Sequence, residues 1–442
     1  MRASSTPKRI LSLLLCIAVL ICSASAFADT TTTSTTSETD TGSDTPAITN
    51  APMAILYEQS TDTVLFSLNS YAHNPPASMT KVMTALLVLE YDPELSGTMV
   101  VPAEAVSERY CYWMEFGHLV EGEEISVWEL MKYLLIPSGN EAGTTLAVYV
   151  AGDIPTFVNM MNEKAAELGM TDTHFEDPHG LSPDSYISAR DMLTLSIYAM
   201  QYEKFREIVR MTEGELPASN KRDEPFPYET SNTVINPGNE KVYQRDYTDD
   251  ILGIKTGYIN EAGRNLASAM VKDDLTFYSV VMHCTATLEG RDMVYGHYND
   301  TLKLFDYARQ FEKQGFAAGD TVCEMELWGW LSGGKTVPFA AKDDIYILAR
   351  EGSELELDTQ IEINGSSVKK GETVGTLTLR DQFGNVRQTE LVAAEDGSIS
   401  LVLPITAISI IVIVAVVIIL AVKHSKKRKA AQESTEDKQE NQ

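Results

Sequence analysis

The sequence has few cysteines, few basic residues and no long apolar run between its two ends, and each shortage excludes a class of protein. Only five of the 442 residues are cysteine. Cys16 and Cys22 lie in an apolar N-terminal segment, which leaves Cys111, Cys284 and Cys323, an odd number spread far apart. This pattern excludes a disulfide-stapled scaffold. At most one bridge can form, and the spacing does not say which.

Basic residues are scarce. The chain has 35 Lys and Arg against 63 Asp and Glu, so its formal net charge is −28 at pH 7. Basic clusters lie at the two ends, and the stretch between them is therefore more acidic still. An acidic surface repels phosphate groups and favours solubility. We expect neither a nucleic acid nor an anionic lipid surface as the partner of this stretch.

Long apolar runs occur only at the ends. Residues 1–28 combine a basic start, an apolar run and a small-residue finish at Ala26-Phe27-Ala28, which predicts a secretory signal peptide cleaved after Ala28. Residues 401–422 carry no charge and exceed the roughly 20 residues that span a bilayer, a length that disfavours the alternative of a buried core helix. The basic KHSKKRK that follows places the tail, residues 423–442, in the cytoplasm. We expect a single-pass cell-membrane protein with its body outside the cytoplasm.

Composition divides that body into three parts. Residues 29–50 are rich in Thr, Ser and Asp, which predicts a disordered spacer. Residues 51–316 have strand-like runs at both ends (MAILYEQSTDTVLFSLN) and helical runs between them (SVWELMKYLLI, FVNMMNEKAAELGM, TLKLFDYARQFEK), which favours an α+β domain of catalytic size. Residues 317–400 alternate apolar and polar positions (DIYILAR, ELELDTQIEI, TVGTLTLRD), which predicts a small all-β domain. No internal repeat is evident.

The stretch PPASMTKVMTALLVLE places Ser78 and Lys81 three residues apart at the start of an apolar helix. This spacing puts both side chains on one helix face, and burying an ammonium group there is costly unless it is neutralised. A serine beside a lysine that can lose its proton is a candidate nucleophile with its base. The structural alternatives are that Ser78 caps the helix and that Lys81 extends its ammonium into water.

Two further motifs favour the catalytic interpretation. Ser138-Gly139-Asn140 follows the helical VWELMKYLLI, and Lys255-Thr256-Gly257 follows a short apolar strand candidate. Together with Ser78 and Lys81 they form the Ser-x-x-Lys, Ser-x-Asn, Lys-Thr-Gly set of β-lactamases and penicillin-binding proteins. Each motif alone is weak, since Ser67-Leu68-Asn69 also fits the second. All three in order, in an exported protein, are a strong signal.

On these motifs the sequence resembles low-molecular-mass penicillin-binding proteins, specifically D-alanyl-D-alanine carboxypeptidases, over roughly residues 50–310. The resemblance extends to LGMTDTHFEDPHGL, EAGRNLASA and Gly290-Arg291. It implies an α+β fold of the β-lactamase and DD-peptidase type, with an antiparallel sheet between helices, followed by an all-β domain and a C-terminal transmembrane helix. It also implies removal of the terminal D-alanine from peptidoglycan stem peptides, with β-lactam antibiotics as covalent inhibitors.

The resemblance assigns a role to each motif residue. Ser78 attacks the carbonyl between the two D-alanines, and Lys81 takes its proton. Ser138 passes the proton to the leaving amine, Asn140 binds a substrate amide, and Lys255 lowers the pKa of Lys81. The implied substrate-binding residues are Thr256 and Arg291 for the terminal carboxylate, Gly257 for close approach of the substrate backbone, and the N–H groups of Ser78 and Tyr258 as the oxyanion hole.

Other features of the sequence fit the resemblance less closely. Arg291 rests on one Gly-Arg pair in MHCTATLEGR, which departs from the family's glycine-rich pattern. RYCYWMEFGH, residues 109–118, replaces a stretch that is commonly rich in glycine and serine in relatives, and we expect it near the cleft mouth. His174 and His179 flank two carboxylates, but the resemblance implies that they pack the fold. We expect no metal and no cofactor.

Two other functions deserve comparison. A class A β-lactamase would carry a Glu-x-x-Leu-Asn loop for deacylation, and no such pattern follows Ser138. A non-catalytic wall-binding or penicillin-sensing protein would have lost Ser78, Lys81 or Lys255, and all three are present.

Overall fold

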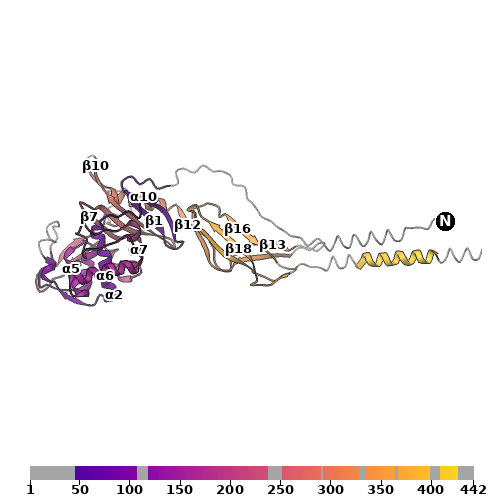
Figure 1. Cartoon of the computed structure of the whole chain (residues 1–442), viewed down its shortest axis with the longest axis horizontal. Helices are drawn as coiled ribbons and strands as arrows, with labels where there is room; N and C mark the ends of the chain where they lie inside the picture. The colour runs from indigo at the N-terminus through magenta and orange to yellow at the C-terminus, as the bar shows by residue number, and fades with distance from the viewer. Residues whose placement is uncertain are drawn as a thin grey trace, which may run out of the picture. The chain divides into compact units, whose positions relative to one another are not determined.

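The computed structural model describes residues 45–106, 118–236, 251–289, 292–327, 335–363, 367–398 and 409–426 (Figure 1). The predicted signal peptide, most of the predicted spacer and most of the tail lie outside these residues. Arg291, Cys111 and nearly all of the segment 109–118 also lie outside them. Cys284 and Cys323 are both free thiols.

A five-stranded antiparallel sheet organises the first folded region. Its strand order is β2-β1-β9-β8-β7. On β1, Met53 and Ile55 face one hydrophobic core, whereas Ala54 and Leu56 face the other. Both faces are covered, which explains why the strand is a continuous apolar run. The strands are β1 (Met53–Glu58), β2 (Thr63–Leu68), β7 (Ile251–Ile259), β8 (Gly263–Lys272) and β9 (Leu275–Cys284).

Helices cover the two faces of this sheet. α10 (Gly296–Ala308) packs against β8 and β9 and contributes to one core. α7 (Ala189–Ala199) packs against β1, β8 and β9 and contributes to the other. The antiparallel sheet between helices confirms the α+β expectation. Strand β7 lies at the sheet's edge, and among the described strands none pairs with its outer side.

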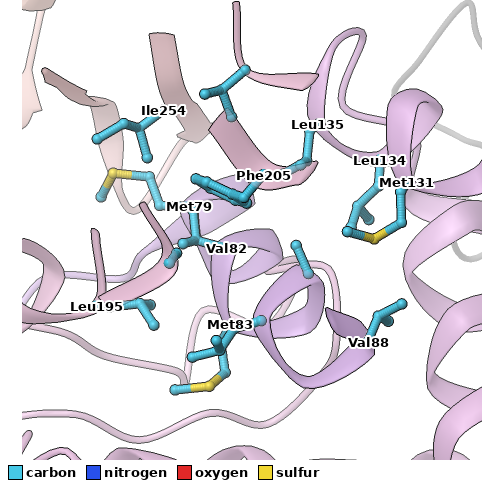
Figure 2. Close-up of a cluster of buried hydrophobic side chains, with 14 of the residues drawn as sticks. Met79, Val82, Met83, Val88, Met131, Leu134, Leu135, Leu195, Phe205 and Ile254 are labelled. Atoms are coloured by element: carbon cyan, nitrogen blue, oxygen red, sulfur yellow. The ribbon is translucent and has the colours of Figure 1, made fainter. Parts of the chain in front are cut away.

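The helix α2 (Lys81–Tyr91) is the centre of the helical part. It packs against α4 (Val127–Leu135), α5 (Asn140–Ala151), α6 (Ile154–Glu167) and α7. Residues 81–89 are all buried, as the lack of a polar face predicts. Figure 2 shows side chains of α2 packed among residues of α4, α7, β7 and the short helix α8 (Glu203–Ile208). This packing fixes the first turn of α2, beside which the motifs meet.

Shorter elements complete the first region. They are the 3-10 helices η1 (Ala77–Thr80) and η2 (Ala103–Val106), and the paired strands β3 (Thr98–Val100) with β4 (Glu124–Ser126), β5 (Glu213–Leu216) with β6 (Phe226–Glu229), and β10 (Ala286–Glu289) with β11 (Asp292–Tyr295).

The second folded region is all β, as the alternating pattern predicts. Its main sheet has the order β13-β14-β19-β18-β16, and β12 pairs with β15 and β17 with β20. Buried apolar residues such as Phe339, Leu377 and Leu391 form its core. The strands are β12 (Phe311–Phe316), β13 (Thr321–Leu327), β14 (Lys335–Ala341), β15 (Ile345–Arg350), β16 (Leu357–Ile361), β17 (Ser367–Val368), β18 (Thr373–Arg380), β19 (Val386–Ala393) and β20 (Gly397–Ser398).

Distant partners decide the local structure near two predicted boundaries. The run TLKLFDYARQFEK stops being helical after Ala308, and its last residues form β12, which pairs with β15 over its whole length. A cross-strand partner here overrides local helical periodicity. At the other end, the N–H groups of Thr49, Asn50 and Ala51 donate to the Asp300 carboxylate, at 3.2, 2.7 and 2.7 Å. The domain boundaries themselves stay predictions.

The C-terminal apolar run forms a helix, Ser409–Lys426, with a mean hydropathy of 2.1. It is long and apolar enough to cross a membrane. It continues past Val422, where the predicted span ends, and residues 401–408 lie outside the described ones.

Candidate active site

Ser78 lies in η1, directly before α2, and is partly exposed. No side chain caps η1 or α2, which excludes the alternative that Ser78 serves as a helix cap. The preceding residue, Ala77, has a φ of +50°, a left-handed conformation that costs a residue with a side chain about 1–2 kcal/mol. Such strain persists where the surroundings impose it, and it gathers at functional sites.

Lys81 is completely buried. Its Nζ lies 2.8 Å from Ser78 Oγ, 3.3 Å from Ser138 Oγ, 2.7 Å from Asn140 Oδ1 and 3.1 Å from the carbonyl oxygen of His179. The ammonium therefore does not extend into water. The first and second motifs meet at this one nitrogen, as the sequence predicts.

Burial lowers the pKa of Lys81 to about 7, against the opposing effect of the Asp177 and Glu141 carboxylates. The neutral amine is therefore well populated near neutral pH. A neutral amine has two N–H donors and one lone pair. Asn140 Oδ1 and the His179 carbonyl can only accept hydrogen bonds, so they engage the two N–H groups. The lone pair is left for a serine hydroxyl, and Ser78 is the closer one.

Ser138 and Asn140 lie where α4 ends and α5 begins. Ser138 has a φ of +75°, so both candidate catalytic serines lie at or beside a left-handed residue. Asn140 is the first residue of α5 and is buried. The next residue, Glu141, is also buried, and burial raises its pKa while the N–H of His118 donates to it at 3.1 Å. The turn between the helices thus directs both motif side chains at Lys81.

Lys255 lies on β7 and is buried. Burial lowers its pKa well below the usual value, and repulsion from Lys81 lowers it further. Burial is the cause that lowers the pKa of Lys81. Repulsion between two ammonium groups is mutual, so the predicted lowering of the Lys81 pKa by Lys255 stays a prediction. Lys255 still brings the third motif to the site, because its Nζ lies close enough to Lys81 for repulsion.

Gly257 allows β7 to approach the segment that carries Ser78. A Cβ at this position would lie 2.6 Å from the carbonyl oxygen of Pro76 and 3.2 Å from the backbone nitrogen of Met79. From the neighbouring strand, the Asn265 side-chain amide donates to the carbonyl of Pro75 at 3.2 Å. The resemblance implies that Gly257 gives the substrate backbone room to approach. The structure adds contact with the serine segment, and it adds Asn265, which the quoted EAGRNLASA contained without indicating a role.

Thr256 and Tyr258 lie on one face of β7, the face opposite to that of Lys255 and Gly257. The Thr256 hydroxyl is 2.7 Å from that of Ser231, and both residues line a cavity beside Lys255. Tyr258 is 52% exposed. Sequence reasoning missed Ser231, because nothing in TSNTVINPG marks it as a neighbour of the Lys-Thr-Gly strand. Arg291 lies outside the described residues, so its predicted place beside Thr256 stays a prediction.

The loop after α6 holds the His179 carbonyl in place. Asp177 accepts hydrogen bonds from the N–H groups of His179, Gly180 and Ser182, and it pairs with His179 Nδ1 at 2.9 Å. Burial opposes its ionisation, but these bonds hold the pKa of Asp177 well below its usual range. The Thr84 hydroxyl, one turn after Lys81, donates to the Pro178 carbonyl at 2.5 Å.

The resemblance implies only that this loop, residues 168–181, packs the fold. The structure also places it against the candidate base. Among the described residues no group of three His, Cys, Asp or Glu side chains could hold a metal ion.

Two family models match this chain. The family model for D-alanyl-D-alanine carboxypeptidase matches residues 39–286, and that for the penicillin-binding protein 5 C-terminal domain matches residues 312–397. The chain is 29% identical over 356 residues to D-alanyl-D-alanine carboxypeptidase DacF of Bacillus subtilis (strain 168), covering 78% of this chain and 85% of the relative.

Solved structures share the fold. Penicillin-binding protein 6B from Escherichia coli aligns with a TM-score of 0.59 at 23% identity, covering 80% of this chain and 99% of the other. Penicillin-binding protein 5 from Haemophilus influenzae aligns with a TM-score of 0.57, also at 23% identity, with the same coverage.

Proposed function

Because the chain belongs to the D-alanyl-D-alanine carboxypeptidase family, we propose that Ser78 is the nucleophile with which it removes the terminal D-alanine from peptidoglycan stem peptides. The chain is a serine peptidase, and its family works through a serine acyl-enzyme and binds penicillin. The observation that supports Ser78 is the buried Lys81 amine, whose two N–H groups have carbonyl acceptors and whose lone pair faces the Ser78 hydroxyl.

The proposed reaction moves one proton through the site. Ser78 Oγ attacks the carbonyl between the two D-alanines and gives its proton to Lys81 Nζ. The resulting oxyanion accepts hydrogen bonds from the N–H groups of Ser78 and Tyr258. Lys81 then returns the proton through Ser138, 3.3 Å away, to the leaving amine, and D-alanine departs. Water then attacks the Ser78 ester and gives a proton to Lys81, which passes it to Ser78 Oγ as the shortened peptide leaves with a new carboxyl group.

In the proposed site the substrate binds along the edge of β7. An extended peptide can add to a sheet edge through main-chain hydrogen bonds, and no described strand pairs with the outer side of β7. Asn140 binds a substrate amide from the opposite wall. Lys255 contributes positive potential when it is protonated, and Gly257 leaves room for the peptide backbone. Thr256 and Arg291 receive the terminal carboxylate.

The experiment is covalent labelling combined with product release. Wild-type protein should bind a fluorescent penicillin covalently and release D-alanine from a peptide ending in D-Ala-D-Ala. Ser78→Ala should abolish both activities. Ser353→Ala, in the all-β region, should change neither. Labelling that survives in Ser78→Ala would move the nucleophile elsewhere.

A carboxypeptidase also requires a free C-terminus. Wild-type protein should leave the C-terminally amidated peptide uncleaved, because Thr256 and Arg291 then have no carboxylate to bind. Equal cleavage of the free and amidated peptides would contradict the carboxypeptidase assignment even if Ser78 were the nucleophile.

The helix Ser409–Lys426 is compatible with membrane attachment. We propose that it anchors the protein in the cell membrane with both folded regions outside and residues 427–442 in the cytoplasm. Protein truncated after Ser400 should appear in the soluble fraction with full activity. Truncated protein that still sediments with membranes would show that another segment is the anchor.

A further inference from the structure

Arg264 lies on β8 directly opposite Tyr258 of β7, on the sheet face that also carries Thr256. Its guanidinium carbon lies 4.4 Å from the centre of the Tyr258 ring and 4.6 Å from that of the Tyr295 ring. Contact with both rings attracts the cation and orients its plane. Stacking uses the faces of a guanidinium and leaves the N–H groups on its rim free to donate.

Arg264 has no acidic partner. In the part of the chain that the structure describes, no carboxylate pairs with it, although acidic residues far outnumber basic ones. A partly exposed arginine in so acidic a chain would be expected to have one. The paired donors of a guanidinium fit a carboxylate well, so this side chain is oriented but lacks the group that it binds best.

A chain of contacts leads from Arg264 back to Thr256. The Tyr295 ring meets that of Tyr298 edge-on, with centres 6.0 Å apart. The Tyr298 hydroxyl donates to the Ser231 carbonyl at 2.8 Å, and the Ser231 hydroxyl bonds that of Thr256 at 2.7 Å. Tyr258, whose ring contacts Arg264, lies two residues beyond Thr256 on the same face of β7. The contacts therefore form a closed circuit from Arg264 to Thr256 and back. Arg264 and the Ser231–Thr256 hydroxyl pair therefore border the same site.

The positive charge of Arg264 is felt by a neighbouring side chain. Burial, and to a lesser degree the charge of Arg264, lowers the pKa of His297, beside Tyr298, to about 3. On the opposite face of β7, Lys255 lies with Gly257 toward the serine segment. The edge strand along which the substrate is proposed to bind therefore has a basic side chain on each face, Lys255 on one and the neighbouring Arg264 on the other.

We propose that Arg264 is a second arginine, in addition to the Arg291 proposed above, that holds the terminal carboxylate of the peptide next to the Ser231–Thr256 hydroxyl pair. The inference rests on the proposed function, since it takes Thr256 as the end of the peptide site. Tyr258 and Tyr295 fix the orientation of the guanidinium before substrate arrives, so little side-chain freedom is lost on binding. Lys255 then serves the reacting centre, and Arg264 serves the end of the substrate.

The test separates carboxylate binding from acyl transfer. Wild-type protein, Arg264→Gln and Arg264→Lys are assayed on an N-acyl peptide ending in D-Ala-D-Ala. They are also assayed on the p-nitrophenyl ester of the same N-acyl-D-alanine, which delivers the same acyl group from a leaving group without a carboxylate. Arg350→Gln is the matched control, because Arg350 also lies over an aromatic ring, Phe311, but on β15.

Hydrogen bonds to charged groups imply a fall of about 10- to 150-fold in kcat/KM for the peptide in Arg264→Gln. The ester should lose far less, so the ratio of the two kcat/KM values should fall by nearly the same factor. Arg264→Lys should recover part of the ratio, and Arg350→Gln should keep it.

Equal losses on peptide and ester would assign Arg264 a structural role in fastening β10 and β11, and the proposal would be wrong. An unchanged ratio would also overturn it. Failure of the proposed function itself would look different, because wild-type protein would then release no D-alanine.

Discussion

The two folded regions of this chain treat polar groups in opposite ways. In the α+β region charged side chains such as Lys81, Glu141 and Lys255 are buried. In the described part of the all-β region, 335–363 and 367–398 included, the buried polar side chains are only those of Thr378 and Thr389. Burying an ionisable group costs free energy or shifts its pKa. In the α+β region this cost gives a lysine whose lowered pKa allows it to act as a base. The all-β region has an apolar core without buried charges among its described residues.

Backbone strain divides in the same way. Ala77 and Ser138 have positive φ values, and so do several other non-glycine residues of the α+β region. From residue 311 on, among the described residues, every positive φ belongs to a glycine. Glycine adopts this conformation without steric penalty. Departures from favourable local structure therefore gather in the region that holds the proposed catalytic residues, and two of them, Ala77 and Ser138, lie at the site itself. Substitutions in either region can test this difference.

The largest effect is expected at the centre of the polar cluster. Lys81→Ala removes the proposed base, so acylation by penicillin should slow by about 10²- to 10⁴-fold, the usual contribution of general base catalysis. Stopped-flow labelling would measure the rate, and circular dichroism would confirm folding. A folded variant that acylates at nearly the normal rate would make Lys81 a structural residue.

A smaller loss is expected where β7 meets the serine segment. Gly257→Ala places a methyl group against the Pro76 carbonyl, so the strand must shift away from Ser78. A displacement of about 1 Å can cost about 10²-fold in rate. Gly384→Asn in the all-β region is the control, since its Cβ would meet nothing within 4 Å and asparagine tolerates a positive φ. Equal acylation rates for the two variants would show that the close approach is unimportant.

Asp177→Asn should change the pH dependence more than the maximal rate. The Asp177 charge raises the pKa of Lys81, so removing it should lower that pKa from about 7. Acylation requires the neutral amine, and its acid limb should therefore move to lower pH. Asp172→Asn, whose side chain pairs instead with the exposed His73, is the control. An acid limb that is unchanged, or that moves to higher pH, would exclude electrostatic coupling between Asp177 and Lys81.

The smallest effect on activity is expected in the all-β core. Phe339 is fully buried there, and Phe339→Ala should destabilise that region by about 3–5 kcal/mol. Calorimetry would show the loss, while kcat/KM for D-alanine release at 25 °C should equal that of wild type. A parallel fall in kcat/KM would show that the two regions are coupled in function.

Much of this architecture can be predicted from sequence. The alternation of apolar and polar residues predicts the strands of the all-β region, and the lack of a polar face predicts the burial of α2. The local structure near residues 50 and 316 could not be predicted, because Asp300 and β15, the partners that decide it, are distant in sequence. Lys81, Ser138 and Asn140 could be predicted to meet because their motifs carry the chemistry in their side chains.

Other parts of the site could not be predicted. Ser231 and Arg264 gain their positions from the edge of a sheet and from aromatic rings on other elements. A serine and an arginine at such positions have no distinctive spacing. Asp177 acts through a loop whose composition equally suits packing.

The contact between Lys81 and the His179 carbonyl has a consequence for mutational mapping of the protein. The acceptor is a main-chain oxygen, and every substitution at residue 179 retains it. A scan that exchanges side chains one at a time would therefore assign little to position 179 and would overlook one of the two acceptors that orient the amine. Replacing the amide that joins residues 179 and 180 with an ester, by chemical ligation, would weaken this oxygen as an acceptor and make its contribution measurable.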